Sequence, residues 1–302
     1  MTPPVESNGQ LRSLGDHLRS NLRGQDHVID RAAAIFRRGE LGLARRDRPR
    51  GAWLAVGPTG TGKTEMVLLC ARHLFGESAI CRFDLSEYQR EDAVERLLGT
   101  GSGDPGALGS RVGERRPLVL LFDELEKAHP KVFDLFIQML DPGRITLADG
   151  RRIDLVDCYL AFTSNLGAAE AARMTRSSLA SVEQAVLRRL GESLRPELIA
   201  RLPEKFVFAP LTPAIQREIG ELHVGREVTR LAQHGFDLQL SRPALEHLLR
   251  QGFDARLGAR PLRQSIEREL QDLVAHSLFV TGQGRGRVEL DPTGQRLVLE
   301  PT

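Results

Sequence analysis

The apolar and polar positions of the first 210 residues predict buried strands that alternate with helices. Stretches with apolar residues at helical spacing lie between short, almost wholly apolar runs, and such runs are typical of strands covered on both faces. The expected strands are 51–57, 79–85, 117–124 and 158–165, and the expected helices are 64–76, 90–99 and 132–140. This order predicts an α/β fold with a parallel sheet flanked by helices.

The pattern changes near residue 210. Three amphipathic stretches follow, at 213–235, 241–253 and 260–279, and then two short alternating runs at 287–290 and 296–300. These favour a smaller C-terminal α+β domain. We therefore predict a polar tail over residues 1–14, an α/β domain over 15–210 and a small domain over 211–302.

Charge and cysteine content narrow the class of protein. The 302 residues carry 42 Lys+Arg and 40 Asp+Glu, and this near balance argues against a dedicated nucleic-acid surface. Cys70, Cys81 and Cys158 are odd in number and widely spaced, which favours reduced, partly buried thiols over a disulfide or zinc site. The sequence has no apolar run of about 18 residues and no signal-peptide pattern at its start, so we expect a cytoplasmic protein without a membrane partner.

The strongest motif follows the first predicted strand. The segment 57–64 reads GPTGTGKT, which matches G-x-x-x-x-G-K-[ST] between a strand and a helix. Backbone N–H groups of such a loop surround phosphates, a lysine reaches the β- and γ-phosphates, and a hydroxyl binds Mg²⁺. A chance glycine turn is the alternative, but the flanking strand and helix favour a nucleotide site. The candidate nucleotide-binding residues are Gly57, Pro58, Thr59, Gly60, Thr61, Gly62, Lys63, Thr64 and Glu65.

Acidic and amide side chains end two of the other predicted strands. Asp123 and Glu124 follow LVLLF, at the strand end where open α/β sheets bind ligands. With Thr64, Asp123 is a candidate Mg²⁺ ligand, and Glu124 is a candidate for orienting the attacking water. The alternative is that the acids cap the next helix. Asn165 ends the strand 158–165 and would face the same water if the strands are neighbours, although Asn is also common in turns.

Several longer segments together resemble one known family, the Clp-type AAA+ ATPases, and in particular the second ATPase module of ClpB, ClpA and ClpV. The resemblance covers residues 15–302 and is carried by GPTGTGKTE, DLSEY, LLFDELEKAHPKVFDLFIQMLDPGRIT, FTSN, LRPELIARL and LGARPLRQSIEREL. It implies an α/β nucleotide domain followed by a small lid domain, with ATP and Mg²⁺ as cofactors. It also implies a chaperone-like ATPase that forms a six-membered ring and acts on protein partners.

The resemblance also implies roles for residues that no local pattern singles out. Arg201 would be the arginine that completes a neighbour's site, with Arg195 as a second candidate. Arg260 would contact the phosphates within its own chain, and Gly24 and Gln25 would lie in the adenine pocket. A guanidinium suits the charge that develops on a transferred phosphoryl group.

Three departures from the family bear on the partner. Ala200 stands where an asparagine usually precedes the trans arginine, which bears on how that arginine is oriented. No tripeptide that docks a barrel peptidase follows FTSN, so we expect no peptidase partner. The stretch 99–110, GTGSGDPGALGS, occupies the place of a loop whose aromatic side chain grips substrate. Asp104 stands at that aromatic position, and an acid cannot pack on a polypeptide as a ring does.

The same stretch contains G-x-G-x-x-G at 101–106, which raises the possibility of a second nucleotide loop or a linker. A helix precedes it instead of a strand, and no helix clearly opens from it, which argues against a nucleotide loop. It also lies between two predicted strands of one domain, which argues against an interdomain linker. The leading hypothesis is therefore an ATP-hydrolysing ring that remodels or disassembles a protein partner. The alternative is a regulatory or scaffolding ATPase whose ATP-dependent assembly is the signal. A DNA-linked AAA+ protein fits the near-neutral charge least well.

Overall fold

The computed structural model describes residues 5–101, 103–112, 118–174, 177–250 and 259–300. The chain divides into two compact units. The first ends at Pro210, and the second runs from Leu211 onward, with Thr59–Thr61 grouped with it. Each unit is described by itself below.

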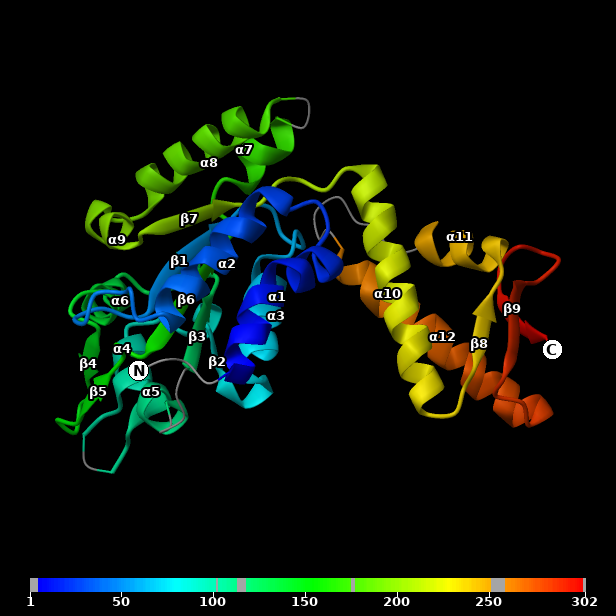
Figure 1. Cartoon of the computed structure of the whole chain (residues 1–302), viewed down its shortest axis with the longest axis horizontal. Coiled ribbons are helices and arrows are strands. Elements are labelled where there is room, and N and C mark those ends of the chain that lie inside the picture. The colour runs from blue at the N-terminus through cyan, green and yellow to red at the C-terminus, as the bar shows by residue number, and fades with distance from the viewer. Residues whose placement is uncertain (1–4, 102, 113–117, 175–176, 251–258, 301–302) are drawn as a thin grey trace. The chain divides into compact units, whose positions relative to one another are not determined.

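A five-stranded sheet forms the centre of the first unit (Figure 1). The spatial order is β2-β3-β6-β1-β7, and every neighbouring pair is parallel. The strands are β1 (Gly51–Val56), β2 (Ile80–Asp84), β3 (Leu118–Asp123), β6 (Cys158–Ser164) and β7 (Glu204–Val207). The predicted parallel α/β fold is confirmed, and β6 lies between β3 and β1, so the carboxyl ends of these three strands are adjacent.

Helices cover both faces of this sheet. One face packs against α1 (Val5–Asn21), α2 (Asp26–Glu40) and α3 (Lys63–Phe75). The other face packs against α4 (Ala93–Leu98), α5 (Gly106–Arg111), α6 (Val132–Leu140), α8 (Leu179–Ser193) and α9 (Pro196–Arg201). Smaller elements are α7 (Ala168–Arg173), the hairpin of β4 (Arg144–Thr146) and β5 (Arg152–Asp154), and the 3-10 turns η1 (Glu77–Ala79), η2 (Leu85–Glu87) and η3 (Leu125–Lys127).

The expectation of a polar tail over residues 1–14 is wrong for its described part. Helix α1 begins at Val5, and Leu11 and Leu14 are buried with Leu18 in the core shared by α1, α2 and α3. These leucines recur at helical spacing, so one stripe of an otherwise polar helix faces the core.

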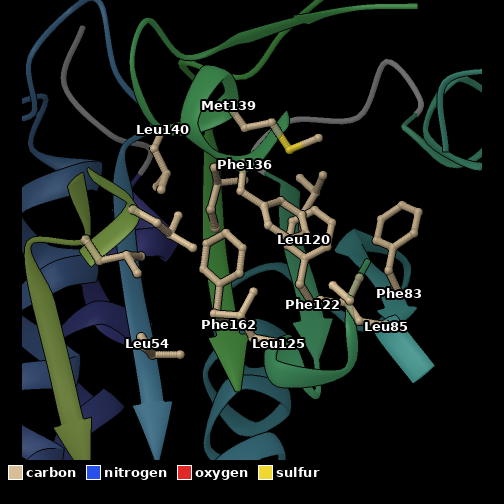
Figure 2. Close-up of a cluster of buried hydrophobic side chains, with 14 of the residues drawn as sticks. Leu54, Phe83, Leu85, Leu120, Phe122, Leu125, Phe136, Met139, Leu140 and Phe162 are labelled. Carbon is tan, nitrogen blue, oxygen red and sulfur yellow. The ribbon is translucent and has the colours of Figure 1, made fainter. Parts of the chain in front are cut away.

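A row of aromatic rings lies just before the carboxyl ends of three strands (Figure 2). Phe83 of β2, Phe122 of β3 and Phe162 of β6 are in register, and the ring centroids are 5.1 and 5.2 Å apart in nearly parallel planes. Phe136 of α6 packs against the row, 4.9 Å from Phe122. Because each ring is fully buried, the row fixes the heights of the strand ends that follow it.

We expect Phe122→Ala to destabilise the first unit by about 3–5 kcal/mol, because the cavity would open in the middle of the aromatic row. The measurement is urea unfolding followed by the fluorescence of Trp53, the single tryptophan, which is buried in this unit. Leu43→Ala is the control, since Leu43 is 70% exposed and its truncation should cost less than about 0.5 kcal/mol. Equal unfolding midpoints for the two variants would contradict the role of the row.

The three cysteines are free and buried, as expected for reduced thiols. Burial raises the pKa of the Cys70 thiol, and it raises that of Cys81 to about 11. Both thiols therefore stay protonated at neutral pH.

The second unit combines helices with a small sheet. The helices are α10 (Pro213–Gln233), α11 (Arg242–Arg250) and α12 (Arg260–Thr281), and the strands are β8 (Leu238–Leu240), β9 (Gly286–Leu290) and β10 (Leu297–Glu300) in the order β10-β9-β8. Apolar side chains of α10, α11 and α12 share a core with β8 and β9. Across the described residues of both units, no helix is long and apolar enough to span a bilayer.

Candidate active site

The glycine-rich loop between β1 and α3 is closely packed against its surroundings. Gly57 and Gly62 have φ values of 135° and 103°, in the region that favours glycine. A Cβ on Gly57 would lie 2.6 Å from the backbone oxygen of Phe208, and one on Gly62 would lie 2.5 Å from the Leu22 side chain. The loop therefore needs glycine both for its backbone path and for its packing.

Lys63 begins α3 and is only 7% exposed. Its Nζ donates to the backbone oxygens of Gly57 and Pro58, at 2.8 and 2.7 Å, and to Oδ1 of Asn165 at 3.0 Å. All three acceptors are uncharged. The ammonium is thus enclosed by the loop without a carboxylate in these contacts, which suits a group that meets an anion.

Thr64 and Asp123 bring two oxygen ligands together. The Thr64 Oγ1 donates to Asp123 Oδ1 at 2.9 Å, although the two residues come from α3 and the end of β3. Hydroxyl and carboxylate oxygens are the donors that Mg²⁺ prefers, so the residues present fit this ion. Asp123 is 3% exposed, and its second oxygen accepts from Arg82 Nε at 2.7 Å.

Glu124 has an unusual backbone. Its φ of 59° makes it the single non-glycine residue with positive φ among the described residues. Its N–H donates to Thr163 Oγ1 at 3.2 Å, and the same hydroxyl donates to Asp123 Oδ1 at 2.7 Å. Glu124 is half-buried, and the contacts described for it involve its backbone. Strained backbone of this kind is concentrated at functional sites.

Asn165 follows β6 and joins the loop to the acidic strand end. Its Oδ1 accepts the Lys63 hydrogen bond, and its backbone N–H donates to Glu126 Oε1 at 3.0 Å. Because β6 lies between β1 and β3, Asn165 stands between the glycine loop and Asp123–Glu124. The structure thus brings Lys63, Thr64, Asp123 and Asn165 together, although they span about 100 positions of the chain.

The predicted adenine-pocket residues have a different kind of contact. Gln25 is fully buried, and its side-chain amide exchanges two hydrogen bonds of 3.0 Å with the backbone of Ala209. Gly24 precedes it with a φ of 71°. Gln25 therefore fixes the segment after β7 to the start of α2. Glu65 lies in the first turn of α3.

Arg201 lies far from the glycine loop of its own chain. Arg201 ends α9, just before β7, and lines a pocket of about 210 Å³ with Gly51 and Glu204 at the amino-terminal edge of the sheet. The loop follows the opposite end of β1, and six residues at about 3.3 Å each separate the two edges by roughly 20 Å. Arg201 Nη1 donates to the backbone oxygen of Glu197, and its Nε is buried without a partner among the described residues.

The other two predicted arginines stand at helix starts, Arg195 at α9 and Arg260 at α12. Arg195 pairs with Asp134 of α6 at 2.6 Å, so its guanidinium is already engaged by a carboxylate. Arg260 begins α12, and its side chain lies outside the described part of the structure.

In the described part of the glycine-rich stretch 99–110, Asp104 ties Thr100 to Gly106. One carboxylate oxygen accepts from the N–H and hydroxyl of Thr100, at 3.1 and 3.2 Å, and the other accepts from Gly106 N–H at 3.0 Å. Helix α5 begins at Gly106, which corrects the expectation that no helix opens from the stretch. The hydrogen-bonding ability of Asp104 explains the turn, because Asp commonly caps backbone N–H groups nearby.

Sequence reasoning missed three side chains of the site: Arg82, Glu126 and Thr163. Arg82 is a charged residue between the apolar Cys81 and Phe83 of a strand, and Glu126 and Thr163 each lie two positions from a candidate residue. These were available signals. Their contacts, however, join different strands and depend on the register of β2, β3 and β6.

Comparison with known proteins divides the chain in two. Residues 48–205 match the family model described as AAA domain (Cdc48 subfamily), and residues 211–285 match the C-terminal, D2-small domain of ClpB protein.

Similar proteins are chaperones and their structural relatives. The chain is 37% identical over 284 residues to the chaperone protein ClpB 2 of Nostoc sp., covering 91% of this chain and 33% of the relative. It is 38% identical over 304 residues to the chaperone protein ClpB of Meiothermus ruber, covering 97% and 36%. A cryoEM structure described as the closed state of Hsp104 with ATPyS and FITC casein matches with a TM-score of 0.86 and 30% identity, covering 98% of this chain and 52% of that one. The chain thus spans about a third of the length of these curated relatives.

Proposed function

We propose that this chain, which belongs to the family described as AAA domain (Cdc48 subfamily), binds ATP with Mg²⁺ and hydrolyses it. In this proposal it remodels a protein partner as a homo-oligomeric, hexameric ring. The observation that carries the proposal is the convergence of Lys63, Thr64, Asp123 and Asn165 at the carboxyl ends of β1, β3 and β6. The carboxyl edge is where open α/β sheets bind ligands.

Nucleotide binding would use the loop and the start of α3. The backbone N–H groups of Gly57–Thr64 and the N-terminal end of α3 would receive the phosphates, and Lys63 would exchange its contacts with Gly57 and Pro58 for phosphate oxygens. Thr64 and Asp123 would hold Mg²⁺, which supplies neutralisation of charge on the β- and γ-phosphates.

Hydrolysis would use Glu124 and Asn165. The carboxylate of Glu124 would orient a water molecule and accept its proton as the water oxygen bonds to the γ-phosphorus and the bond from phosphorus to the ADP oxygen breaks. Asn165, held between the loop and the acidic strand end, would position the same water with its amide. These roles require orientation more than chemistry, which suits residues fixed at strand ends.

A second protomer would complete each site with Arg201. The roughly 20 Å between the two sheet edges prevents Arg201 from reaching the phosphates bound by its own loop. In the described part of the chain no carboxylate pairs with its guanidinium, whereas Arg195 is bound to Asp134. Arg260, in the second unit, would contact the phosphates in cis, and Gly24 and Gln25 would support the adenine.

The relatives support a protein substrate. Two of them are named chaperones, and the structural relative is described with an ATP analogue and casein. We extend from these names only the class of partner, a polypeptide, and propose no peptidase partner. We also propose a cytoplasmic location, where the three buried thiols remain reduced.

One observation favours the scaffolding alternative. In the described part of 99–110 no aromatic side chain is present, and the Asp104 carboxylate is used to hold Thr100 and Gly106 in a tight turn. If this turn faces the pore of the hexamer, it offers no aromatic side chain to pack on a threaded polypeptide. Addition of FITC-labelled casein tests the difference: stimulated ATP hydrolysis supports remodelling, and ATP-dependent assembly without stimulation supports scaffolding.

Arg201→Ala is expected to lower kcat by about 10³-fold, as loss of an arginine finger does, while leaving ATP affinity within about threefold of the wild type. Mixing this variant with Glu124→Gln provides a sharper measurement. In a mixed ring, an Arg201→Ala protomer keeps its own Glu124 and receives Arg201 from its Glu124→Gln neighbour, so activity should exceed the sum of the two separate variants.

The control is Arg195→Ala, whose ion pair with Asp134 is half-exposed and should matter little to hydrolysis. Absence of complementation in the mixture, together with hydrolysis that is independent of protein concentration, would contradict the trans role of Arg201. If the wild-type protein does not hydrolyse ATP, the proposed function is contradicted.

A further inference from the structure

Two side chains outside the proposed set of roles connect the ends of β3 and β6. Thr163 is the next-to-last residue of β6 and is 3% exposed. Glu126 lies in η3, the turn that directly follows β3 and Glu124. Each of them holds the backbone of a candidate residue that belongs to the other strand. The inference from this arrangement rests on the proposed function.

Thr163 holds the end of β3. Its Oγ1 accepts the Glu124 N–H at 3.2 Å and donates its own hydrogen to Asp123 Oδ1 at 2.7 Å. A hydroxyl has one donor and two acceptor positions, so both contacts can exist at once. One buried hydroxyl thus fixes two consecutive residues of the acidic strand end.

The contact is needed because Glu124 is strained. Its φ and ψ of 59° and 53° lie in the left-handed region, which costs about 1–3 kcal/mol for a residue other than glycine. The Thr163 hydroxyl binds its N–H, and the Lys127 N–H donates to its carbonyl at 2.8 Å. The peptide groups on both sides of Glu124 are therefore tied, which sets the direction of its side chain.

Glu126 holds the end of β6 in return. Its Oε1 accepts the Asn165 N–H at 3.0 Å, while its Oε2 is buried and has no hydrogen-bond partner among the described residues. A buried carboxylate oxygen without a donor is unfavourable for stability. Its presence is better explained by the position that the carboxylate gives Asn165 than by stabilisation of the fold.

We propose that Thr163 and Glu126 are positioning residues that form a reciprocal clamp, in which each strand end fixes the catalytic residue of the other. The clamp sets the distance between the Glu124 carboxylate and the Asn165 amide, and so the place of the attacking water between them. A displacement of about 1 Å at such a site can lower the rate by about 10²-fold without contact between the altered residue and the substrate.

The first experiment separates kcat from affinity. Thr163→Val and Glu126→Ala remove the two clamp contacts, and each is expected to lower kcat at least tenfold while the Kd of the probe ATPγS changes less than threefold. Thr163→Ser and Glu126→Gln keep an acceptor oxygen at each position and should restore most of the rate. Thr229→Val is the matched control, because its exposed hydroxyl on α10 donates to the Gly225 carbonyl and lies outside the candidate site.

The second experiment does not depend on activity. Amide hydrogen exchange measured by NMR should become at least tenfold faster at Glu124 in Thr163→Val and at Asn165 in Glu126→Ala. Each substitution should affect the amide of the opposite strand end most strongly, and the Ser and Gln variants should restore slow exchange. A variant that merely loosens the fold would accelerate exchange along all five strands.

The two experiments distinguish a failure of the clamp proposal from a failure of the proposed ATPase function. If the wild type hydrolyses ATP and both Thr163→Val and Glu126→Ala keep its kcat, the clamp is overturned and the proposed function stands. Failure of the wild type to hydrolyse ATP would remove the proposed function. In that case the exchange rates alone decide, and unchanged exchange at Glu124 and Asn165 would overturn the clamp as well.

Discussion

Glu124→Gln is expected to lower the rate constant of ATP hydrolysis by about 10²–10⁴-fold, the contribution typical of a positioned general base. The variant should still bind ATP, because the loop, Lys63, Thr64 and Asp123 are intact. Since Gln is nearly isosteric with Glu, the strained backbone at this position and its hydrogen bond to Thr163 should persist. The protein would then accumulate in its ATP-bound, assembled form.

Single-turnover hydrolysis and size-exclusion chromatography in the presence of ATP measure these two effects. Glu192→Gln is a suitable control, because Glu192 lies on the surface of α8 and forms an exposed pair with Arg189. Hydrolysis by Glu124→Gln at the wild-type rate would remove Glu124 from the role of base.

Lys63→Ala is expected to abolish nucleotide binding at millimolar concentrations. Removal of one partner from a buried, hydrogen-bonded charge pair typically costs about 2–5 kcal/mol, or roughly 30- to several-thousandfold in Kd. Lys63 is nearly fully buried, and its Nζ already lies within hydrogen-bond distance of three acceptors of the loop and of Asn165, so its truncation removes a positioned charge. Isothermal titration calorimetry with ATPγS measures the change.

The fold of this variant must be checked, because the substitution removes the hydrogen bonds to Gly57, Pro58 and Asn165. The fluorescence of buried Trp53 serves as that measurement. Lys131→Ala is the control, since Lys131 is exposed just before α6 and should bind ATPγS as the wild type does. Tight binding by a folded Lys63→Ala protein would contradict the assignment of the loop.

The central site was predictable because its residues lie in local patterns. Asp123 and Glu124 end an apolar run, and Lys63 lies in a spaced glycine motif between a strand and a helix. Arg82 and Thr163 could not be assigned in the same way. Their partner Asp123 lies about 40 positions away in the chain, and only the register of neighbouring strands places them within hydrogen-bond distance.

The two wrong predictions, a polar tail at the start of the chain and no helix after the glycine-rich stretch, also arose from contacts that the sequence pattern does not show. Residues 1–14 were expected to be a polar tail, but α1 begins at Val5, and Leu11 and Leu14 contribute through burial against α2 and α3. Helix α5 was not expected because Gly106 is a poor helix former. The Asp104 carboxylate, which accepts from the Gly106 N–H, stabilises that start in a way that composition does not reveal.

The sequence by itself determined the class of fold and the chemical groups of the candidate site. An apolar run or a glycine motif can be recognised from a few neighbouring residues, because backbone sterics and side-chain chemistry act over that range. Only the tertiary structure decided which groups meet. The order β3-β6-β1 places Asn165 between the glycine loop and Glu124, and sheet geometry sets Arg201 at the opposite edge. These are distances between strands, and they arise from packing of the whole sheet.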